Sequence, residues 1–155
     1  TSPEQGSFAL TVFFSIGIFM TYIGGLLGDK YGPIKIIRLS LLVWLPAMFL
    51  LTEVPTFSPL IMMPIAYLLL LMIGAAKAIS YSPVIVLGQT YLAKSIGFAS
   101  GITLGVSQTI GGVIAPVVGN LADTYSLPVA MMTLVPFLVM GLGASLILKD
   151  PKKLQ

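Results

Sequence analysis

Two long runs of this sequence contain no charged residue: residues 39–51 read LSLLVWLPAMFLL, and residues 60–74 read LIMMPIAYLLLLMIG. Only 8 % of the chain is charged, whereas soluble domains carry about 25 % charged residues. So few charges cannot cover a soluble domain that must also hide such runs from water. The mean hydropathy of +1.04 supports the same conclusion. We therefore expect the surrounding solvent to be lipid and the fold to be an all-α membrane protein.

Five segments are long and apolar enough to cross a bilayer as helices, which takes about 20 predominantly apolar residues. They cover about residues 8–27, 36–52, 60–92, 97–121 and 127–148. The third segment is too long for one crossing, so we expect it to bend at Pro83 or to extend beyond the bilayer. No linker or soluble domain separates the segments, so residues 1–155 are predicted to form a single transmembrane unit.

The basic residues predict the orientation, because cytoplasmic loops of membrane proteins carry an excess of Lys and Arg. With alternating crossings, one side of the membrane holds seven basic residues: Lys30, Lys35, Arg38, Lys94, Lys149, Lys152 and Lys153. The loops on the other side, around Glu4, Glu53 and Asp123, hold none. We expect an integral protein of the plasma (inner) membrane with its amino terminus outside and its carboxy terminus in the cytoplasm. An odd number of crossings that starts outside without a secretory signal predicts a piece of a larger protein.

The composition excludes several classes of function. The sequence has no Cys and no His, so it offers no thiolate or imidazole metal ligand and no histidine base to activate a nucleophile. Ser145, in the segment GASL, is accordingly interpreted as a small packing residue. The net charge is +3 and the basic residues form no block that could bind nucleic acid. We expect no enzymatic activity, no metal, no cofactor and no nucleic-acid partner.

Two of the predicted helices carry small residues three or four positions apart. The first holds Gly17, Thr21, Gly24 and Gly28 at this spacing. On the fourth, a helix-packing stripe of Gly97, Gly101, Gly105, Gly112 and Gly119 keeps the same step together with Gln108 and Ala115. At 100° per residue, each set lies within one narrow stripe. Small residues let helix backbones approach closely in a membrane. Both a static packing contact and a sliding contact between moving halves agree with this pattern.

Residues 25–35 read GLLGDKYGPIK and lie between two predicted helices on the basic side. This segment resembles the signature loop of the major facilitator superfamily. Three later segments resemble the carboxy-terminal half of the fosmidomycin-resistance branch of that superfamily: VLGQ at 86–89, IGFASGITLG at 96–105 and GNLAD at 119–123. The resemblance extends over about residues 11–150.

The resemblance implies a fold and a function. The five helices would correspond to helices eight to twelve of a twelve-helix fold, so that the chain is a partial carboxy-terminal transmembrane domain whose partner is the missing amino-terminal half. The function implied is movement of a small solute by alternating access, as efflux of a drug or an anionic metabolite, for example by an antiporter. A coupling proton is left open. The alternatives are uptake of an organic anion and a truncated membrane protein that binds others without transporting.

The charged hairpin is predicted to be a gating loop made of Gly25, Gly28, Asp29, Lys30, Gly32 and Lys35. A tight turn is expected to need the backbone freedom of Gly28 and Gly32, while the basic residues hold it on the cytoplasmic side. By resemblance, Asp29 engages a helix of the other half when the cytoplasmic gate is shut. The alternative is that Asp29 only balances Lys30 in a hydrated loop.

Three polar side chains are predicted at membrane depth as candidates for a cavity or a substrate site: Lys77, Gln108 and Thr109. A lysine near the centre of a helix is costly when it faces lipid. Lys77 is therefore expected to reach the cytoplasmic surface, to pair with an acid of the missing half, or to meet an anionic substrate in a cavity. Gln108 is expected to line a cavity or to form a hydrogen bond between helices.

Overall fold

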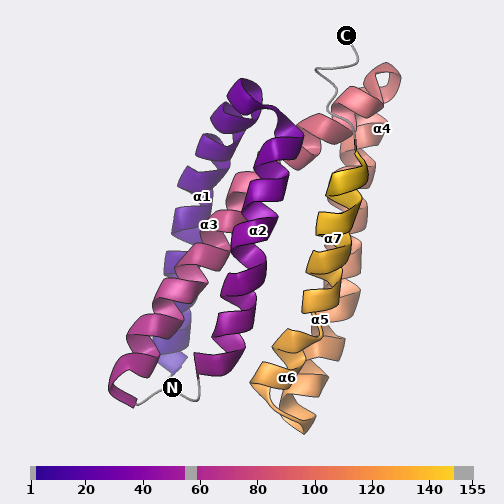
Figure 1. Ribbon diagram of the computed structural model, residues 1–155. Helices are drawn as coiled ribbons and strands as arrows, with labels where there is room; N and C mark the ends of the chain where they lie inside the picture. The colour runs from indigo at the N-terminus through magenta and orange to yellow at the C-terminus, as the bar shows by residue number, and fades with distance from the viewer. Residues whose placement is uncertain (1–2, 55–58, 149–155) are drawn as a thin grey trace.

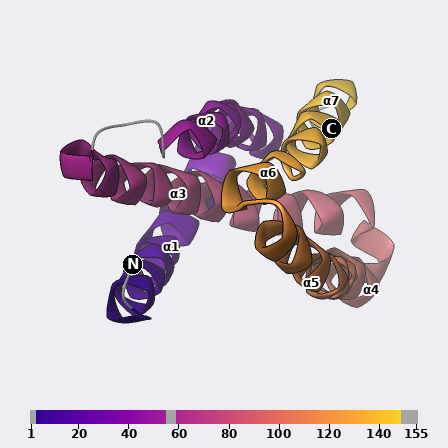
Figure 2. The ribbon, with the colours of Figure 1, turned by 90° about the horizontal axis from the view of Figure 1, so that it is seen from below.

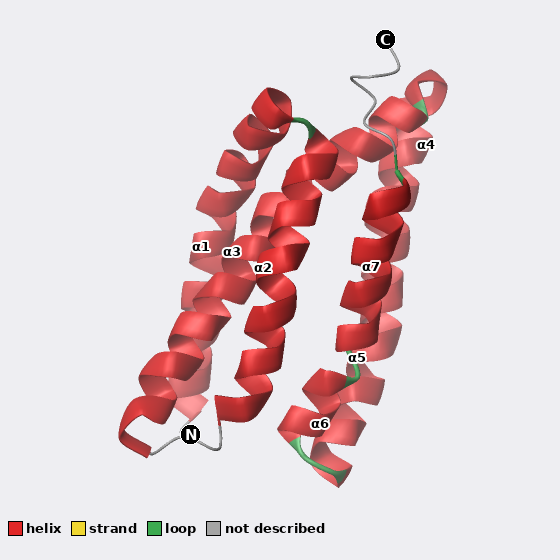
Figure 3. Cartoon of the chain, viewed as in Figure 1, coloured by secondary structure: helices red, strands yellow, loops and turns green. Residues whose placement is uncertain are grey.

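The computed structural model describes residues 3–54 and 59–148, and every element in these two ranges is helical (Figure 3). Five helical stretches of the described chain are long and apolar enough to cross a membrane, which confirms the predicted all-α class and number of spans. The elements are α1 (Pro3–Tyr31), α2 (Pro33–Glu53), α3 (Pro59–Tyr91), the 3₁₀ turn η2 (Ala93–Ser95), α4 (Ile96–Gly101), the π-helical turn η3 (Ile102–Val106), α5 (Ser107–Thr124), α6 (Leu127–Met132) and α7 (Val135–Ile147).

The helix α3 is the central element of the described chain, because it packs against both α1 and α2. In Figure 1 these three helices run up and down beside one another, and α7 lies next to α2. Seen from below, α2 and α7 lie on one side of α3, and α1 and α5 lie on the other (Figure 2). Within the described chain, α5 packs only against its sequence neighbours η3 and α6.

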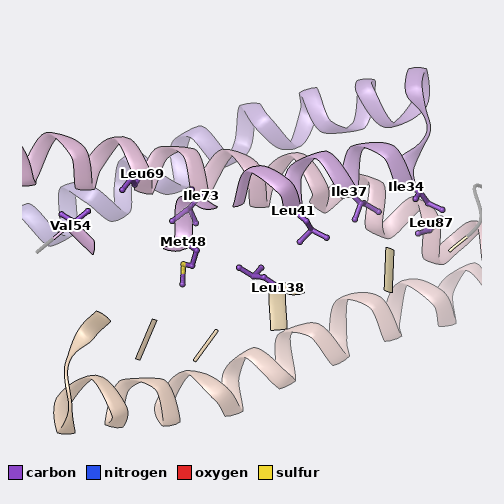
Figure 4. Packing of buried hydrophobic residues seen from close by; sticks show 10 residues of the cluster. Ile34, Ile37, Leu41, Met48, Val54, Leu69, Ile73, Leu87 and Leu138 are labelled. Carbon is purple, nitrogen blue, oxygen red and sulfur yellow. The ribbon is translucent and has the colours of Figure 1, made fainter. Parts of the chain in front are cut away.

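Most of the buried apolar residues that the structure describes form one cluster between α2, α3 and α7. On α2, Ile34, Ile37 and Leu41 recur at the spacing that places side chains on one helix face. Leu138 of α7 lies between Leu41 and Met48 in the view of Figure 4. Lipid tails are as apolar as leucine, so this cluster stabilises the bundle by close packing and not by removing apolar surface from water.

Three glycines of α1, Gly24, Gly25 and Gly28, lie where α1 meets α3. A Cβ atom at Gly24 would overlap the backbone of Ile79, and one at Gly28 would lie 3.2 Å from Cγ of Pro83. At Gly17 a Cβ would meet nothing within 4 Å. The predicted close approach of helices is therefore confirmed for Gly24 and Gly28 but not for Gly17.

The third predicted segment forms one continuous helix, with Pro83 buried inside it. At about 1.5 Å per residue its 33 residues measure about 50 Å, against about 30 Å for the hydrocarbon core. Tilt, a bend at Pro83 or extension beyond the bilayer must take up the difference, and which of them does so stays a prediction.

The fourth and fifth predicted segments are interrupted. A π-helical turn separates α4 from α5, and residues 133–134 separate α6 from α7. The second interruption has a direct cause, since Pro136 has no N–H to donate to the carbonyl of Met132. Just before Pro136 the chain turns more tightly, since the N–H groups of Thr133 and Leu134 donate to the carbonyls of Ala130 and Met131, three residues back. The Thr133 hydroxyl also donates to the carbonyl of Ala130, at 2.6 Å.

The hairpin at Gly32, the turn η2 and the end of α7 share one end of the bundle, at the top of Figure 1. The end of α2 and the turn between α5 and α6 share the other. The described basic residues near the helix ends, Lys30, Lys35, Arg38 and Lys94, are thus gathered at one end. Lys149, Lys152 and Lys153, which also entered the predicted charge asymmetry, lie outside the described residues. Which end faces the cytoplasm stays a prediction.

Candidate functional site

The predicted gating loop is a one-residue turn between two helices. Gly32 has φ 94° and ψ 138°, a backbone conformation that side chains disfavour, and its N–H donates to the carbonyl of Gly28 at 2.9 Å. Pro33 follows as the first residue of α2, where its missing N–H costs nothing. The expectation that Gly28 supplies backbone freedom is wrong, because Gly28 lies inside α1 with ordinary helical geometry and is needed for the contact with Pro83.

The charged residues of the hairpin are exposed at the ends of α1 and α2. Asp29 and Lys30 lie in the last turn of α1, and Lys35 lies in the first turn of α2. The ammonium of Lys30 is 5.2 Å from the ring centroid of Tyr31. An acid in the last turn of a helix faces the negative end of that helix dipole, which disfavours it by about 0.3–1 kcal/mol. Asp29 is therefore not placed to stabilise its own helix.

Arg38 has a role that sequence reasoning missed. Its Nε and Nη2 donate to the carbonyl of Ser145 at 2.9 and 2.6 Å, and Nη2 also lies 3.3 Å from the carbonyl oxygens of Leu146 and Leu148. These carbonyls end α7 and have no partner within the helix. Arg38 of α2 thus caps the carboxy-terminal end of α7, where a cation also complements the helix dipole.

Lys77 lies beside a groove between α1 and α3. The groove measures about 300 Å³, and its lining includes Phe13, Phe14, Lys77 and Tyr81. The Lys77 ammonium is 5.8 Å from the ring centroid of Phe13, which is its interaction partner within the described residues. The sequence predicted a lysine at membrane depth, but its aromatic neighbours could not be predicted.

The contact with Phe13 offsets only part of the cost of placing Lys77 in a membrane. A lysine at the centre of a membrane helix costs about 2.5–3.5 kcal/mol on insertion scales. A cation over an aromatic ring gains about 0.5–1 kcal/mol when exposed and about 2 when desolvated. About 0.5–3 kcal/mol is left for water, an acid or a bound anion to supply.

Gln108 and Thr109 do not join Lys77. Both are exposed on α5, which makes no contact with α1 or α3 in the described chain. The Thr109 hydroxyl donates to the carbonyl of Gly105 within its own helix at 2.9 Å. Thr109 borders a second, apolar groove of about 410 Å³ along the fourth span. The three predicted cavity residues therefore belong to two separate surfaces of the described chain.

The predicted packing stripe of the fourth span has no partner among the described helices. A Cβ at Gly97, Gly101, Gly105, Gly112 or Gly119 would meet nothing within 4 Å. The fourth span contacts α3 at Ser100 and Thr103 instead. Nε2 of Gln89 donates to Oγ of Ser100 at 2.9 Å, and Thr103 lies against Gly88. What covers the stripe stays a prediction.

Comparison with known proteins indicates the kind of protein. The chain is similar to an MFS-type transporter. It is 31 % identical over 151 residues to the uncharacterized MFS-type transporter YfnC of Bacillus subtilis, a protein of the major facilitator superfamily by its name. The match covers 97 % of this chain but 35 % of YfnC, so the chain spans about a third of that relative's length. No family model matches the chain, and no solved structure matches it. Together with five apolar helices, the likeness supports an integral membrane protein related to such transporters.

Proposed function

We propose that the chain is part of the carboxy-terminal half of a major facilitator transporter, with its five spans corresponding to helices eight to twelve. The complete protein would move a small solute by alternating access, as efflux of a drug or an anionic metabolite. The observation that carries this proposal is the likeness to an MFS-type transporter over nearly the whole chain. The similarity to the fosmidomycin-resistance branch is part of the proposal.

The proposal gives the hairpin at Gly32 a place in the mechanism. Asp29 is exposed at the end of α1, where it is not stabilised by its own helix dipole. A helix amino terminus of the other half would stabilise it there when the cytoplasmic gate is shut. Opening the gate would break this contact and return Asp29 to water. The basic end of the bundle would then face the cytoplasm.

A flux assay tests the proposal. The complete protein would be reconstituted into liposomes, and movement of an anionic, a neutral and a cationic fluorescent dye would be followed with and without a pH gradient. We expect at least one dye to cross several-fold faster than in protein-free liposomes, with saturation at high concentration. Flux equal to that of protein-free liposomes for every dye would reject transport by this protein for these solute classes.

One observation favours the alternative of a truncated membrane protein that binds other proteins without transporting. The uncovered glycines of the fourth span are a surface on which another membrane helix could pack. In a transporter this helix belongs to the same polypeptide, whereas a truncated partner protein would use one from another protein. Uptake of an organic anion differs only in direction, which the same liposomes measure when the gradient is reversed.

A further inference from the structure

We propose that the groove between α1 and α3 binds small organic anions that carry an aromatic body, with the Lys77 ammonium as the anion-binding group. This inference rests on the proposed transport function and names the solute class that the groove would select. It depends on three features of the groove: the position of the ammonium over the Phe13 ring, the direction of the Lys77 side chain, and a lining without a described carboxylate.

The Lys77 ammonium lies over the ring of Phe13, and this ring fits beside α3 because residue 74 is a glycine. Two ring atoms of Phe13 lie 2.9 and 3.0 Å from where a Cβ of Gly74 would be. Any side chain at Gly74 would push this ring away. The ring also packs edge-to-face on Phe14, with centroids 5.7 Å apart. The Phe13 ring, whose centroid is 5.8 Å from the ammonium, thus packs against both Gly74 and Phe14.

The direction of the Lys77 side chain argues against its reaching the nearer membrane surface. Lys77 is closer to the end of α3 at Tyr91 than to the beginning at Pro59. Its ammonium nevertheless lies over a ring that packs on Gly74, one turn toward Pro59. Side chains on a helix lean toward its amino terminus, which agrees with this direction. The ammonium is thus directed back along α3 into the groove.

The groove lining offers an anion a cation, a donor and apolar walls. Lys77 is the charged residue of the lining, and it pairs with no carboxylate of the described residues. The hydroxyl of Tyr81, one turn further along α3, has no hydrogen-bond partner in the described part of the chain, so it is available to donate. Phe13, Phe14 and Ile18 form the apolar walls. A volume of about 300 Å³ lies at the lower end of the range of small-ligand pockets.

These features favour a compact amphiphilic anion over the alternatives. A cation would meet the Lys77 charge without any compensating acid, and a neutral solute would leave that charge unpaired in a medium of low dielectric constant. The remaining competitor is a carboxylate from a part of the protein outside residues 1–155. Such an acid would neutralise Lys77 permanently and leave the groove without selectivity for anions, which an experiment can detect.

A binding measurement on the complete protein, purified in detergent, tests this inference. The probes are naphthalenesulfonate and its neutral counterpart naphthalenesulfonamide, which share the aromatic body and differ in charge. We expect the wild-type protein to bind the sulfonate at least tenfold more tightly. Lys77→Gln should weaken sulfonate binding about tenfold or more and change sulfonamide binding less than twofold, because only the anion loses its counter-charge. Lys77→Arg should keep the preference.

Lys94→Gln provides the matched control, since Lys94 is exposed on η2 and lies outside the groove. It should leave the binding of both probes unchanged. The inference is overturned if the wild-type protein shows no preference for the sulfonate. It is also overturned if Lys77→Gln weakens the two probes equally, or if it leaves both unchanged as a permanent internal pair would predict.

A second variant tests the groove without touching the lysine. Gly74→Ala should displace the Phe13 ring and weaken both probes by a similar factor, because the shared aromatic body loses its wall. Gly143→Ala is the control, as a Cβ there meets nothing within 4 Å. Unchanged binding in Gly74→Ala would show that the probes bind elsewhere, and would overturn the inference even if Lys77→Gln failed to fold.

The two proposals fail in different ways. Binding needs no transport, so anion-selective binding through Lys77 in a protein with no flux would reject the transport function alone. Flux of the dyes without any effect of Lys77→Gln on anion preference would reject the groove alone.

Discussion

Removal of the Arg38 cap should loosen the last turn of α7 without disturbing the rest of the bundle. The guanidinium joins the beginning of α2 to the end of α7, and it donates twice to the carbonyl of Ser145. In Arg38→Gln the charge and the fork of donors are both lost. In Arg38→Lys the charge remains, but the ammonium cannot reproduce the paired donors of the guanidinium.

The size of the effect follows from the contacts. A hydrogen bond to a charged group contributes about 1.5–3 kcal/mol, and a cation at a helix carboxy terminus about 0.3–2 kcal/mol. Nε and Nη2 share one acceptor, so we count them as one strong contact. We expect Arg38→Gln to lower the free energy of opening the last turn by about 2 kcal/mol, and Arg38→Lys by about 1 kcal/mol.

Hydrogen–deuterium exchange of the complete protein measures this opening locally. Since about 1.4 kcal/mol corresponds to a factor of ten, amides in the last turn of α7 should exchange about 30-fold faster in Arg38→Gln and about fivefold faster in Arg38→Lys. Amides of α1 serve as the internal reference, because α1 makes no contact with α7 in the described chain.

Ser145→Ala is the matched control for the cap. The Ser145 hydroxyl donates to the carbonyl of Leu142 within α7, whereas Arg38 uses the backbone carbonyl of Ser145, which the substitution keeps. Exchange in Ser145→Ala should stay within about threefold of the wild-type rate. The reasoning is refuted if Arg38→Gln exchanges within twofold of wild type, or if Ser145→Ala has an effect as large as Arg38→Gln.

Three further predictions concern the α1–α3 contact, Asp29 and the topology. Gly24→Ala should lower the stability of the complete protein by roughly 1–3 kcal/mol because its Cβ overlaps the α3 backbone, whereas Gly17→Ala should change it little; thermal unfolding in detergent compares the two. Asp29→Asn should slow dye flux at least several-fold with little loss of folded protein, and full flux would leave Asp29 as a hydrated loop charge. A cysteine in place of Tyr125 should react with an impermeant thiol reagent added outside sealed cells, and one in place of Lys94 should not; the reverse pattern would invert the topology.

The fold was predictable from the sequence to the level of its spans. Hydropathy and length are properties of single segments, so the five crossings and the helical class could be predicted without knowledge of packing. The interruptions could not be placed as well. Pro136 signals one of them, but nothing in the structure explains the position of the π-helical turn at residues 102–106.

The contacts between helices were predictable only in part. The stripe on α1 indicated a close approach of another helix, but not that this helix is α3. It also could not show that Gly24 contacts α3 whereas Gly17 does not. The proximity of Lys77 to Phe13 depends on the register between α1 and α3, which that approach sets. The Arg38 contact joins residues 107 positions apart and uses a backbone carbonyl, an acceptor that every residue carries. The contact therefore could not be predicted from the type of residue at position 145.

The length of the complete protein is the decisive measurement. Because 151 aligned residues make up 35 % of YfnC, that transporter is about 430 residues long. We expect the reading frame to continue upstream of Thr1 with about seven further apolar spans, and the intact mass of the protein from its native membrane to match a chain of similar length to YfnC. A mature protein of 155 residues and 16.4 kDa, with no apolar span before Thr1, would reject the transporter and leave the membrane partner protein.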